Sequence, residues 1–282
     1  MKFANVLLLA EAAMAARLTQ RRRESHAKRA LARKSHPKIA SDRPATVINS
    51  TNVEYSENWA GAVIISEDIT EVTATITVPS VSAPSDDDSG FGGDDEYCAS
   101  AWVGIDGDTC ETAILQTGVD FCYSDGEVSY DAWYEWYPDY AYDFDLDVSE
   151  GDVLTFTVTA TSSTGGTAVI ENQTTGDTVT QDFSNESDGS LCQTNAEWIV
   201  EDFEEDDSLV AFADFGTVTF SDATATASGS TLNPEDATTM DIEQDDEVLT
   251  SVSVSSDTVV VTYTSDSSSS GSGSGGSGFG GF

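Results

Sequence analysis

The stretch EVTATITVP, residues 71–79, decides the fold class of this chain. Val72, Ala74, Ile76 and Val78 are apolar, and a threonine separates each of them from the next. Successive side chains of a β-strand point to opposite faces, so this alternation gives the strand one apolar and one polar face. The stretch therefore predicts a strand whose apolar face packs against a hydrophobic core.

Runs of similar character continue along the chain, separated by clusters of Gly, Ser, Asp and Asn. They are NWAGAVII, SAWVGID, TAILQTGVDF, DAWYEWYP, DVLTFTVTAT, TAVIENQTT, AEWIVEDF, TVTFSDATAT, VLTSVSV and DTVVVTYT. No stretch of ten residues combines helical periodicity with helix-capping residues. We predict an all-β protein in which residues 52–264 form one sandwich domain, followed by a flexible Gly/Ser-rich tail at residues 265–282.

The N-terminus has the layout of a secretory signal. Lys2 gives a short positive start, FANVLLLAEAAMAA is an apolar run, and AMA is a small-residue cleavage pattern that ends at Ala15. We predict that residues 1–16 are a signal peptide and that the protein is secreted and extracellular, with a buried helix as the alternative. Because the apolar run is too short to span a bilayer, we predict no membrane segment.

Basic residues are confined to the first part of the chain. All 11 Lys and Arg residues and both His residues lie within residues 1–43. Only three of the 51 acidic residues lie there. The remaining 48 acidic residues lie in residues 44–282, which contain no base and are called the acidic body below. Residues 17–51, called the basic segment below, are interpreted as a propeptide that neutralises the acidic body during folding. Nucleic-acid binding by this segment is the alternative, but the acidic body would repel DNA.

The missing bases predict tolerance of acid. Carboxylates lose their charge at about pH 4, whereas Lys, Arg and His are positive there, so an ordinary protein in strong acid becomes a self-repelling polycation. A body without bases approaches neutrality instead. Crowded carboxyls have raised pKa values in the folded state, so their stabilising effect is present at low pH and is lost as the pH rises. Adaptation to high salt is the competing explanation.

The absence of Lys, Arg and His excludes several kinds of catalytic site from residues 44–282. Without histidine there is no Ser-His-Asp or Cys-His arrangement and no usual zinc site, and without lysine there is no Schiff base and no P-loop. Carboxyl groups, assisted by amides, tyrosines and water, remain for acid–base chemistry. The sequence indicates neither a metal nor a cofactor.

The covalent features fit an exported protein. An even number of cysteines predicts two disulfides, and the spacing alone leaves three connectivities open for Cys98, Cys110, Cys122 and Cys192. Asn172, in NQT, and Asn185, in NES, are predicted glycosylation acceptors if the host is eukaryotic.

Two stretches combine aromatic and acidic residues. In YDAWYEWYP, alternation puts Asp131, Trp133, Glu135 and Tyr137 on one face and Tyr130, Ala132, Tyr134 and Trp136 on the other. In AWVGIDGD, it puts Trp102 and Asp106 on one face and Val103 and Ile105 on the other. These patterns favour either a solvated sheet face with aromatic cover or a cleft that binds an extended polymer.

Several long blocks together resemble one protein family. SENWAGAVI, TVPS, AWVGIDGDTCETAILQTGVDF, YDAWYEWYP, FSNESDGSLCQTNAEWIVEDFE and FADFGTVTF occur in this order and are similar to blocks of the fungal glutamic peptidases, the eqolisins. The similarity covers nearly all of residues 52–264 and neither the leader nor the tail. It implies a lectin-like sandwich of two bent antiparallel sheets in a monomeric, secreted acid endopeptidase that is insensitive to pepstatin and cleaves polypeptide substrates.

The resemblance also implies particular residues. Gln116 matches the catalytic glutamine, and Glu201, rather than Glu197, matches the catalytic glutamate. Five further residues match positions that line the substrate cleft or support it: Trp59, Trp102, Asp106, Glu135 and Glu204. In such a site a carboxyl relays protons between water and the leaving nitrogen, and a neutral amide stabilises the oxyanion. The basic segment would occupy the cleft as an intramolecular inhibitor until acid releases it.

The family's disulfide corresponds to Cys110–Cys192, which leaves Cys98 and Cys122 as a second pair. Glu111 stands where the family has an amide, so one more charge lies near the site.

Two other functions remain open on the residues alone. A β-sandwich glycosidase also uses paired carboxylates in an aromatic cleft, and Glu135 with Glu201 would serve as that pair. A non-catalytic, acidic, lectin-like wall protein is the other, with calcium at GIDGD, although that motif lacks the spacing of a full calcium loop.

Overall fold

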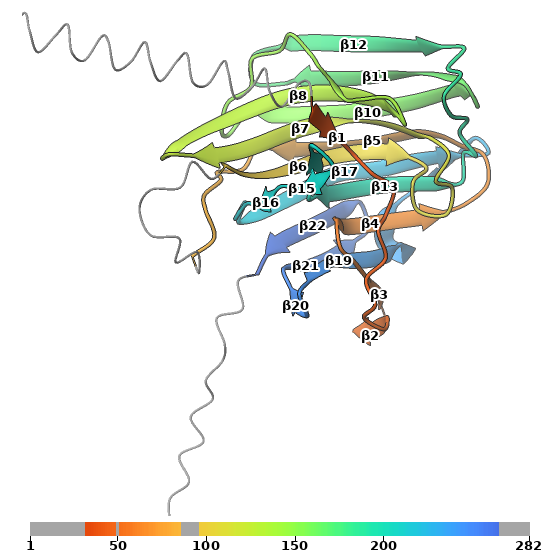
Figure 1. The fold of residues 1–282 in the computed structure, drawn as a ribbon. Helices are drawn as coiled ribbons and strands as arrows, with labels where there is room; N and C mark the ends of the chain where they lie inside the picture. The colour runs from red at the N-terminus through yellow and green to blue at the C-terminus, as the bar shows by residue number, and fades with distance from the viewer. Residues whose placement is uncertain (1–31, 49–50, 86–95, 265–282) are drawn as a thin grey trace, which may run out of the picture.

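A computed structural model describes residues 32–48, 51–85 and 96–264. Two large β-sheets pack face to face, and a small third sheet lies against the outer side of one of them (Figure 1). The prediction of an all-β sandwich is confirmed. In these ranges no helix has the length and apolarity needed to cross a membrane. The predicted signal peptide, residues 17–31 of the basic segment and the tail at 265–282 lie outside the described residues.

The first sheet has eight strands. In spatial order they are β12 (Asp177–Ser184), β11 (Gly165–Asn172), β10 (Val153–Ser162), β5 (Ile69–Thr77), β17 (Thr217–Ala227), β22 (Thr258–Tyr263) and β21 (Thr250–Ser255), with β18 (Ser230–Leu232) paired to β17. All of its pairings are antiparallel. A 3-10 helix, η1 (Pro234–Asp236), leads from this sheet to the second.

The second sheet has eleven strands and carries the candidate site. In spatial order they are β2 (Thr46–Ile48), β3 (Thr51–Ser56), β19 (Thr238–Gln244), β4 (Trp59–Ile65), β13 (Asn195–Glu201), β6 (Glu96–Ile105), β7 (Ile114–Ser124), β8 (Glu127–Tyr137) and β9 (Tyr142–Asp143), with β20 (Glu247–Val248) beside β19 and β16 (Ala211–Phe212) beside β6. Two pairings, β3 with β19 and β6 with β16, are parallel. The sheet is therefore mixed at these points rather than wholly antiparallel.

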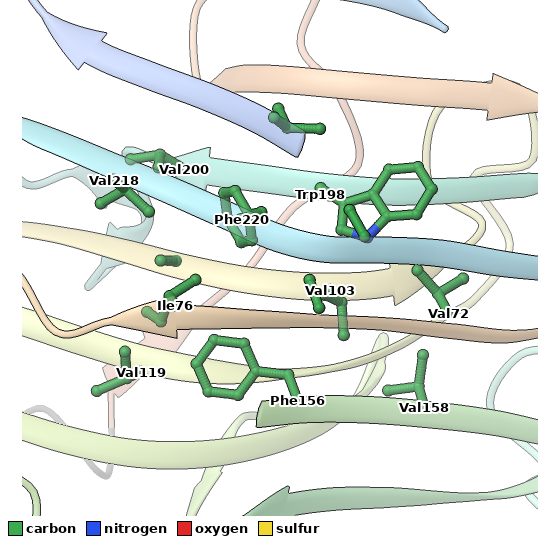
Figure 2. Close-up of a cluster of buried hydrophobic side chains, with 14 of the residues drawn as sticks. Val72, Ile76, Val103, Val119, Phe156, Val158, Trp198, Val200, Val218 and Phe220 are labelled. Carbon is green, nitrogen blue, oxygen red and sulfur yellow. The ribbon is translucent and has the colours of Figure 1, made fainter. Parts of the chain in front are cut away.

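The main core lies between the two sheets (Figure 2). Val72 and Ile76 of β5 point into it, as the alternation in residues 71–79 predicts. They meet Trp198 and Val103 from the second sheet and Phe156 from β10. Each large side chain buried in this way contributes roughly 1.5–3 kcal/mol to folding, so the shared core fixes the second sheet firmly against the first.

The opposite face of the second sheet, called the outer face below, carries a separate aromatic cluster. Trp59, Trp102 and Trp133 are fully buried there and pack with smaller apolar residues. Trp133 and Glu135 point to the outer face while Trp136 points into the main core, which confirms the alternation expected for β8. The outer face thus has an apolar floor on which polar groups can be held out of water.

Two disulfides tie the strands of the outer face to their loops. Cys98–Cys122 joins directly opposed residues of β6 and β7, and Cys110–Cys192 joins the loop after β6 to the segment before β13. Cys110–Cys192 is the bridge that the family resemblance implies, and Cys98–Cys122 is the pair that it leaves over. The bridges fasten both strands that carry the proposed catalytic pair.

The basic segment contributes strands of its own. Its residues 46–48 form β2 beside β3, and β3 begins at Thr51, next to the predicted domain start at residue 52. Upstream, β1 (Arg33–Lys34) pairs with β14 (Glu204–Glu205), which pairs with β15 (Ser208–Leu209) in the small third sheet. The sequence did not predict these strands. β1 forms only by pairing with the distant β14, and β2 pairs with the adjacent β3, which is itself held by the distant β19.

Candidate active site

Glu201 and Gln116 lie on the outer face of the second sheet. Glu201 ends β13 and Gln116 lies in β7, and both strands pair with β6, which runs between them. Both side chains are fully buried. The structure therefore brings the two predicted catalytic residues to the same face, on either side of one strand.

Two tryptophans hold the carboxyl group of Glu201. The indole N–H of Trp102 donates to Oε2 over 2.9 Å, and that of Trp59 donates to Oε1 over 3.4 Å. Trp102 packs against two glycines. A Cβ added at Gly104 would come within 2.7 Å of the indole ring, and a Cβ added at Gly118 would come within 2.5 Å of the Trp102 Cβ. These glycines leave room for Trp102, whose hydrogen bond, together with that of Trp59, orients the carboxyl.

Gln116 pairs with Glu135. The two residues are opposed across β7 and β8, and Nε2 of Gln116 donates to Oε2 of Glu135 over 3.2 Å. Oε1 of Gln116 and Oε1 of Glu135 are buried and have no hydrogen-bond partner among the described residues. The amide therefore has one oriented donor and a free acceptor beside a second buried carboxyl.

Burial controls the ionisation of both glutamates. Removal from water raises the pKa of Glu201 to about 7, although the charge of Arg33 and the N–H of His36 act to lower it. Burial likewise raises the pKa of Glu135 to about 8, with Arg33 lowering it and the charge of Glu201 raising it. Both carboxyls therefore take up protons more readily than exposed ones.

Arg33 of the basic segment lies within this site. Its guanidinium forms a two-pronged ion pair with Asp120, with Nε–Oδ2 at 2.7 Å and Nη2–Oδ1 at 3.1 Å. It also donates to Glu135 over 3.2 Å and to Ser100 over 3.3 Å, and it lies 3.8 Å above the centre of the Trp133 ring. Arg33 is only 3% exposed, so a cation from the basic segment is deeply buried among the acids of the site.

The next residues of the basic segment cross over Glu201. The main-chain N–H of His36 donates to Oε1 of Glu201 over 3.2 Å, and its imidazole Nε2 lies 2.9 Å from Oε2 of Glu204. Lys38 forms ion pairs with Glu54, at 3.0 Å, and with Asp108. The basic segment thus covers the site and pairs its cations with acids around it.

Comparison with known proteins identifies the family. The sequence matches the Peptidase A4 family over residues 57–263. It is 60% identical to aspergillopepsin-2 of Aspergillus niger over 271 residues, 90% of this chain and 96% of that protein. It is 48% identical to scytalidopepsin B of Scytalidium lignicola over 202 residues, 69% of this chain and 73% of that protein.

The chain belongs to the Peptidase A4 family and is a glutamic peptidase.

Solved structures agree with this identification. The crystal structure of scytalido-glutamic peptidase with a transition state analog inhibitor matches with a TM-score of 0.67 at 47% identity, over 74% of this chain and 98% of that chain. Aspergilloglutamic peptidase from Aspergillus niger matches with a TM-score of 0.59 at 71% identity, over 60% of this chain and 99% of that chain. The glycosidase and lectin alternatives are therefore not supported.

The other predicted site residues of the peptidase have different surroundings. Trp59, Trp102 and Glu135 contact the predicted catalytic pair directly, and Glu204 lies next to the basic segment. Asp106 does not contact the pair. Its carboxylate accepts the main-chain N–H groups of residues 193–195, over 2.7, 2.8 and 3.2 Å, and so fixes the entry to β13. With both oxygens occupied in this way, Asp106 is a poor candidate for a calcium ligand.

One of the two glycosylation predictions is wrong. Asn172 is fully buried, and its Nδ2, the atom that would carry the glycan, donates to Asp152 over 2.9 Å. Its Oδ1 accepts the N–H groups of Thr174 and Thr175, which closes the turn after β11. The triplet is a structural turn rather than a surface acceptor. Asn185 is exposed, and its glycosylation stays a prediction.

The site residues that sequence reasoning missed are Arg33 itself and two of its partners, Asp120 and Ser100. Asp120 lies four residues after Gln116 in β7, which is an even number. Strand alternation alone could therefore have placed it on the outer face with Gln116. Ser100 lies two residues before Trp102 in the same way. No local signal distinguishes Arg33 from the other bases of the basic segment, because its role depends on contacts made 87 and 102 residues away.

Proposed function

We propose that this peptidase is a secreted endopeptidase that hydrolyses peptide bonds of polypeptides at low pH, with Glu201 and Gln116 as its catalytic pair. The observation that carries the proposal is the setting of Glu201. It is a fully buried carboxyl fixed by the indole N–H groups of Trp102 and Trp59, with an amide on the same sheet face. Secretion is supported by the signal-like N-terminus and by the two disulfides.

The proposed reaction uses the carboxyl of Glu201 twice. In its ionised form it takes a proton from a water molecule, whose oxygen attacks the carbonyl carbon of the substrate. It then passes that proton to the nitrogen of the breaking peptide bond. The hydrogen bonds from Trp102 and Trp59 favour the ionised form that the first step requires.

Gln116 would serve the oxygen atoms of the same reaction. Its amide N–H stabilises the negative oxygen of the tetrahedral intermediate, and its free Oε1 accepts a hydrogen bond from the attacking water. An amide keeps the same protonation state throughout the acid range. Imidazole is absent from residues 44–282, and a neutral donor of this kind suits a site that works in acid.

We also propose that the basic segment inhibits the peptidase until the pH falls. It covers Glu201, and Arg33 neutralises Asp120 and Glu135. Burial raises the pKa of both of these carboxyls, so they are protonated early on acidification. Arg33 then remains as a buried cation without a counter-ion, which is strongly unfavourable and drives the segment out of the site. Departure of the segment also readmits water and lowers the pKa of Glu201 toward its working range.

The experiment that tests the proposed function is digestion of a denatured protein at about pH 3 in the presence of pepstatin. The expected result is release of peptides by the chain from which the basic segment has been removed. The same preparation should release no reducing sugar from polysaccharides. A folded preparation that releases no peptide at any pH between about 2 and 5 would contradict the proposal.

A further inference from the structure

The pocket that holds the guanidinium of Arg33 supplies an acceptor for each of its five N–H groups. Nε and Nη2 donate to Asp120 over 2.7 and 3.1 Å, and Nη2 also donates to the hydroxyl of Ser100 over 3.3 Å. Nη1 donates to Glu135 over 3.2 Å and to the hydroxyl of Ser35 over 3.1 Å. Of these acceptors, only Ser35 belongs to the basic segment. The pocket is therefore built almost entirely by the peptidase domain.

Two aromatic rings form the walls of this pocket. The central carbon of the guanidinium lies 3.8 Å from the centre of the Trp133 ring and 4.9 Å from the centre of the Phe203 ring. Both rings are fully buried. Trp133 belongs to the aromatic cluster of the outer face, and Phe203 packs against the Cys98–Cys122 bridge. A cation is attracted to the face of an aromatic ring, so walls fixed by the domain favour a guanidinium between them.

The acceptors of the pocket are also positioned by the domain. Ser100 and Asp120 are directly opposed across β6 and β7. The hydroxyl of Ser100 accepts the indole N–H of Trp133 over 3.1 Å, and Oε2 of Glu135 accepts the amide N–H of Gln116 over 3.2 Å. These bonds do not involve the basic segment. The pocket is therefore pre-organised, and its shape does not depend on the presence of Arg33.

The geometry of the pocket suits arginine and not lysine. A guanidinium is planar, binds a carboxylate through two parallel hydrogen bonds and stacks on aromatic rings, whereas an ammonium is a compact charge with three donors. The neighbouring Lys34 lies outside the pocket, with its Nζ 5.7 Å from the centre of the Tyr137 ring. A side chain that fills the pocket must therefore carry a guanidinium group.

We infer that this pocket is an arginine-binding subsite of the active peptidase, which selects polypeptide substrates that carry an arginine on the N-terminal side of the bond to be cut. The inference rests on the proposed function, since it names a substrate class for that site. The chain that carries Arg33 passes over Glu201, where the N–H of His36 lies 3.2 Å from Oε1. Glu135 contacts both the guanidinium and Gln116. An arginine in the pocket therefore fixes the chain that follows it over the proposed catalytic pair.

The charge of the pocket depends on pH. Burial raises the pKa of Asp120 and of Glu135, and a bound guanidinium lowers both. The charge of Asp131 on β8 adds to the rise for Asp120, and that of Glu201 on β13 adds to the rise for Glu135. The hydroxyl of Tyr137 stays neutral, since burial and the charge of Glu135 raise its pKa. Selection of arginine is therefore strongest at the upper end of the active pH range and is lost in strong acid, where the two carboxyls are protonated.

A binding experiment tests the pocket without requiring activity. Arg33→Ala empties the pocket in the full chain, and ethylguanidinium or ethylammonium is added at about pH 7. Tryptophan fluorescence follows binding, because the guanidinium lies over the Trp133 ring. We expect ethylguanidinium to bind at least about tenfold more tightly than ethylammonium. Arg43→Ala, which removes an exposed arginine and leaves the pocket filled, is the control and should respond to neither probe.

A second experiment tests selection by the active peptidase. The unmodified full chain is held at about pH 3 until its digestion of a denatured protein is constant, and the released peptides are removed. It then receives peptide pairs that differ only in one arginine or its neutral analogue citrulline. We expect kcat/KM to be about tenfold higher for the arginine peptide at about pH 5 and nearly equal for the two at about pH 2.5. Mass spectrometry should place the cut on the C-terminal side of the arginine.

Two variants connect this selection to the pocket. Asp120→Asn removes the two-pronged ion pair, so its arginine-to-citrulline ratio should fall to about one at both pH values. Asp131→Asn removes a neighbouring charge, opposite Asp120 on β8, and should keep the ratio of the unmodified peptidase. Because each ratio compares two peptides on the same variant, a general loss of activity does not alter it.

The other outcomes separate the inference from the proposed function. Equal binding of the two probes by a folded Arg33→Ala chain would overturn the inference, and the peptide pairs decide alone if that variant does not fold. An active peptidase with a ratio of about one at about pH 5, or with the same ratio in Asp120→Asn, would overturn the inference and leave the proposed function standing. A folded sample that cuts neither the peptides nor denatured protein would overturn the proposed function, and the inference with it.

Discussion

Trp102 donates its indole N–H to Oε2 of Glu201 over 2.9 Å, and this bond orients the proposed catalytic carboxyl and favours its ionised form. Trp102→Phe removes the donor and keeps most of the ring. Because the bond favours the ionised form, its loss raises the pKa of Glu201. We expect the acid limb of the pH–activity profile to move up by about one pH unit and turnover to fall about tenfold.

Trp136→Phe is the matched control for this change. Trp136 lies in the same sheet, but its indole N–H donates to the carbonyl oxygen of Gly189, away from the site. The pH–activity profile of this variant should keep its position. If the two variants shifted the profile equally, the shift would reflect general loosening of the sheet and not the bond to Glu201.

Gln116→Ala removes the proposed oxyanion donor. We expect turnover to fall by about two to three orders of magnitude with little change in KM, since the donor acts mainly on the intermediate. Steady-state kinetics on a peptide substrate measure both constants. Gln173→Ala, an exposed position, is the control and should behave as the unmodified enzyme. A turnover within threefold of the unmodified enzyme for Gln116→Ala would remove Gln116 from the mechanism.

Arg33→Met tests the proposed inhibition by the basic segment. The change leaves Asp120 and Glu135 without their counter-ion while keeping an apolar stem, and breaking a buried pair costs about 3–5 kcal/mol. We expect the full chain to become active at a pH at least one unit higher than the unmodified chain. The pH at which activity first appears is measured by assaying the full chain directly after each step of acidification. Arg43→Met, at an exposed position 4.0 Å from Glu243, should leave it unchanged.

Buried carboxyls without cations make the domain sensitive to alkali once the basic segment is gone. Burial raises the pKa of Asp241 to about 7 and that of Glu197 well above its ordinary value. Such a carboxyl has a higher pKa in the folded protein than in the unfolded chain, where the pKa is about 4. Its contribution to the stability of the fold is complete below about pH 4 and is lost as the pH rises through the pKa of the folded state. The processed peptidase should therefore unfold as the pH rises past neutrality.

Asp241→Asn isolates one contribution to this effect. The amide keeps an acceptor for the hydroxyl of Thr250 but cannot ionise. We expect the variant to unfold at a higher pH than the unmodified protein, with a gain of roughly 2–4 kcal/mol at neutral pH. Circular dichroism during a pH titration measures the midpoint, and Asp177→Asn at an exposed position is the control. An unchanged midpoint would show that Asp241 does not limit stability at neutral pH.

The sequence predicted what depends on local pattern. Alternation in residues 71–79 and in β8 placed side chains such as Ile76 and Glu135 on the correct faces, because a strand in a two-layer fold repeats every second residue. The catalytic pair was assigned by resemblance and not by pattern, since an isolated Gln or Glu on a strand is ordinary. The structure then placed both residues on one face.

The sequence could not predict contacts that depend on the closed fold. The Asn172 triplet looks like an acceptor site, yet pairing of the β10–β11 hairpin buries it against Asp152. The parallel pairing of β3 with β19 joins segments almost 190 residues apart and has no local signature. The choice of Arg33 among eleven bases likewise follows from the position of Asp120 and not from its neighbours in sequence.

The most direct test of the central claim is the activity of Glu201→Gln in acid, measured on chains from which the basic segment has been removed. Glutamine keeps the shape and an acceptor for Trp102 but cannot carry the proton between water and the leaving nitrogen. We predict a folded protein whose peptide release from a denatured substrate at about pH 3 is at least ~1,000-fold below that of the unmodified peptidase. A folded Glu201→Gln protein with activity within tenfold of the unmodified peptidase would contradict the assignment of Glu201.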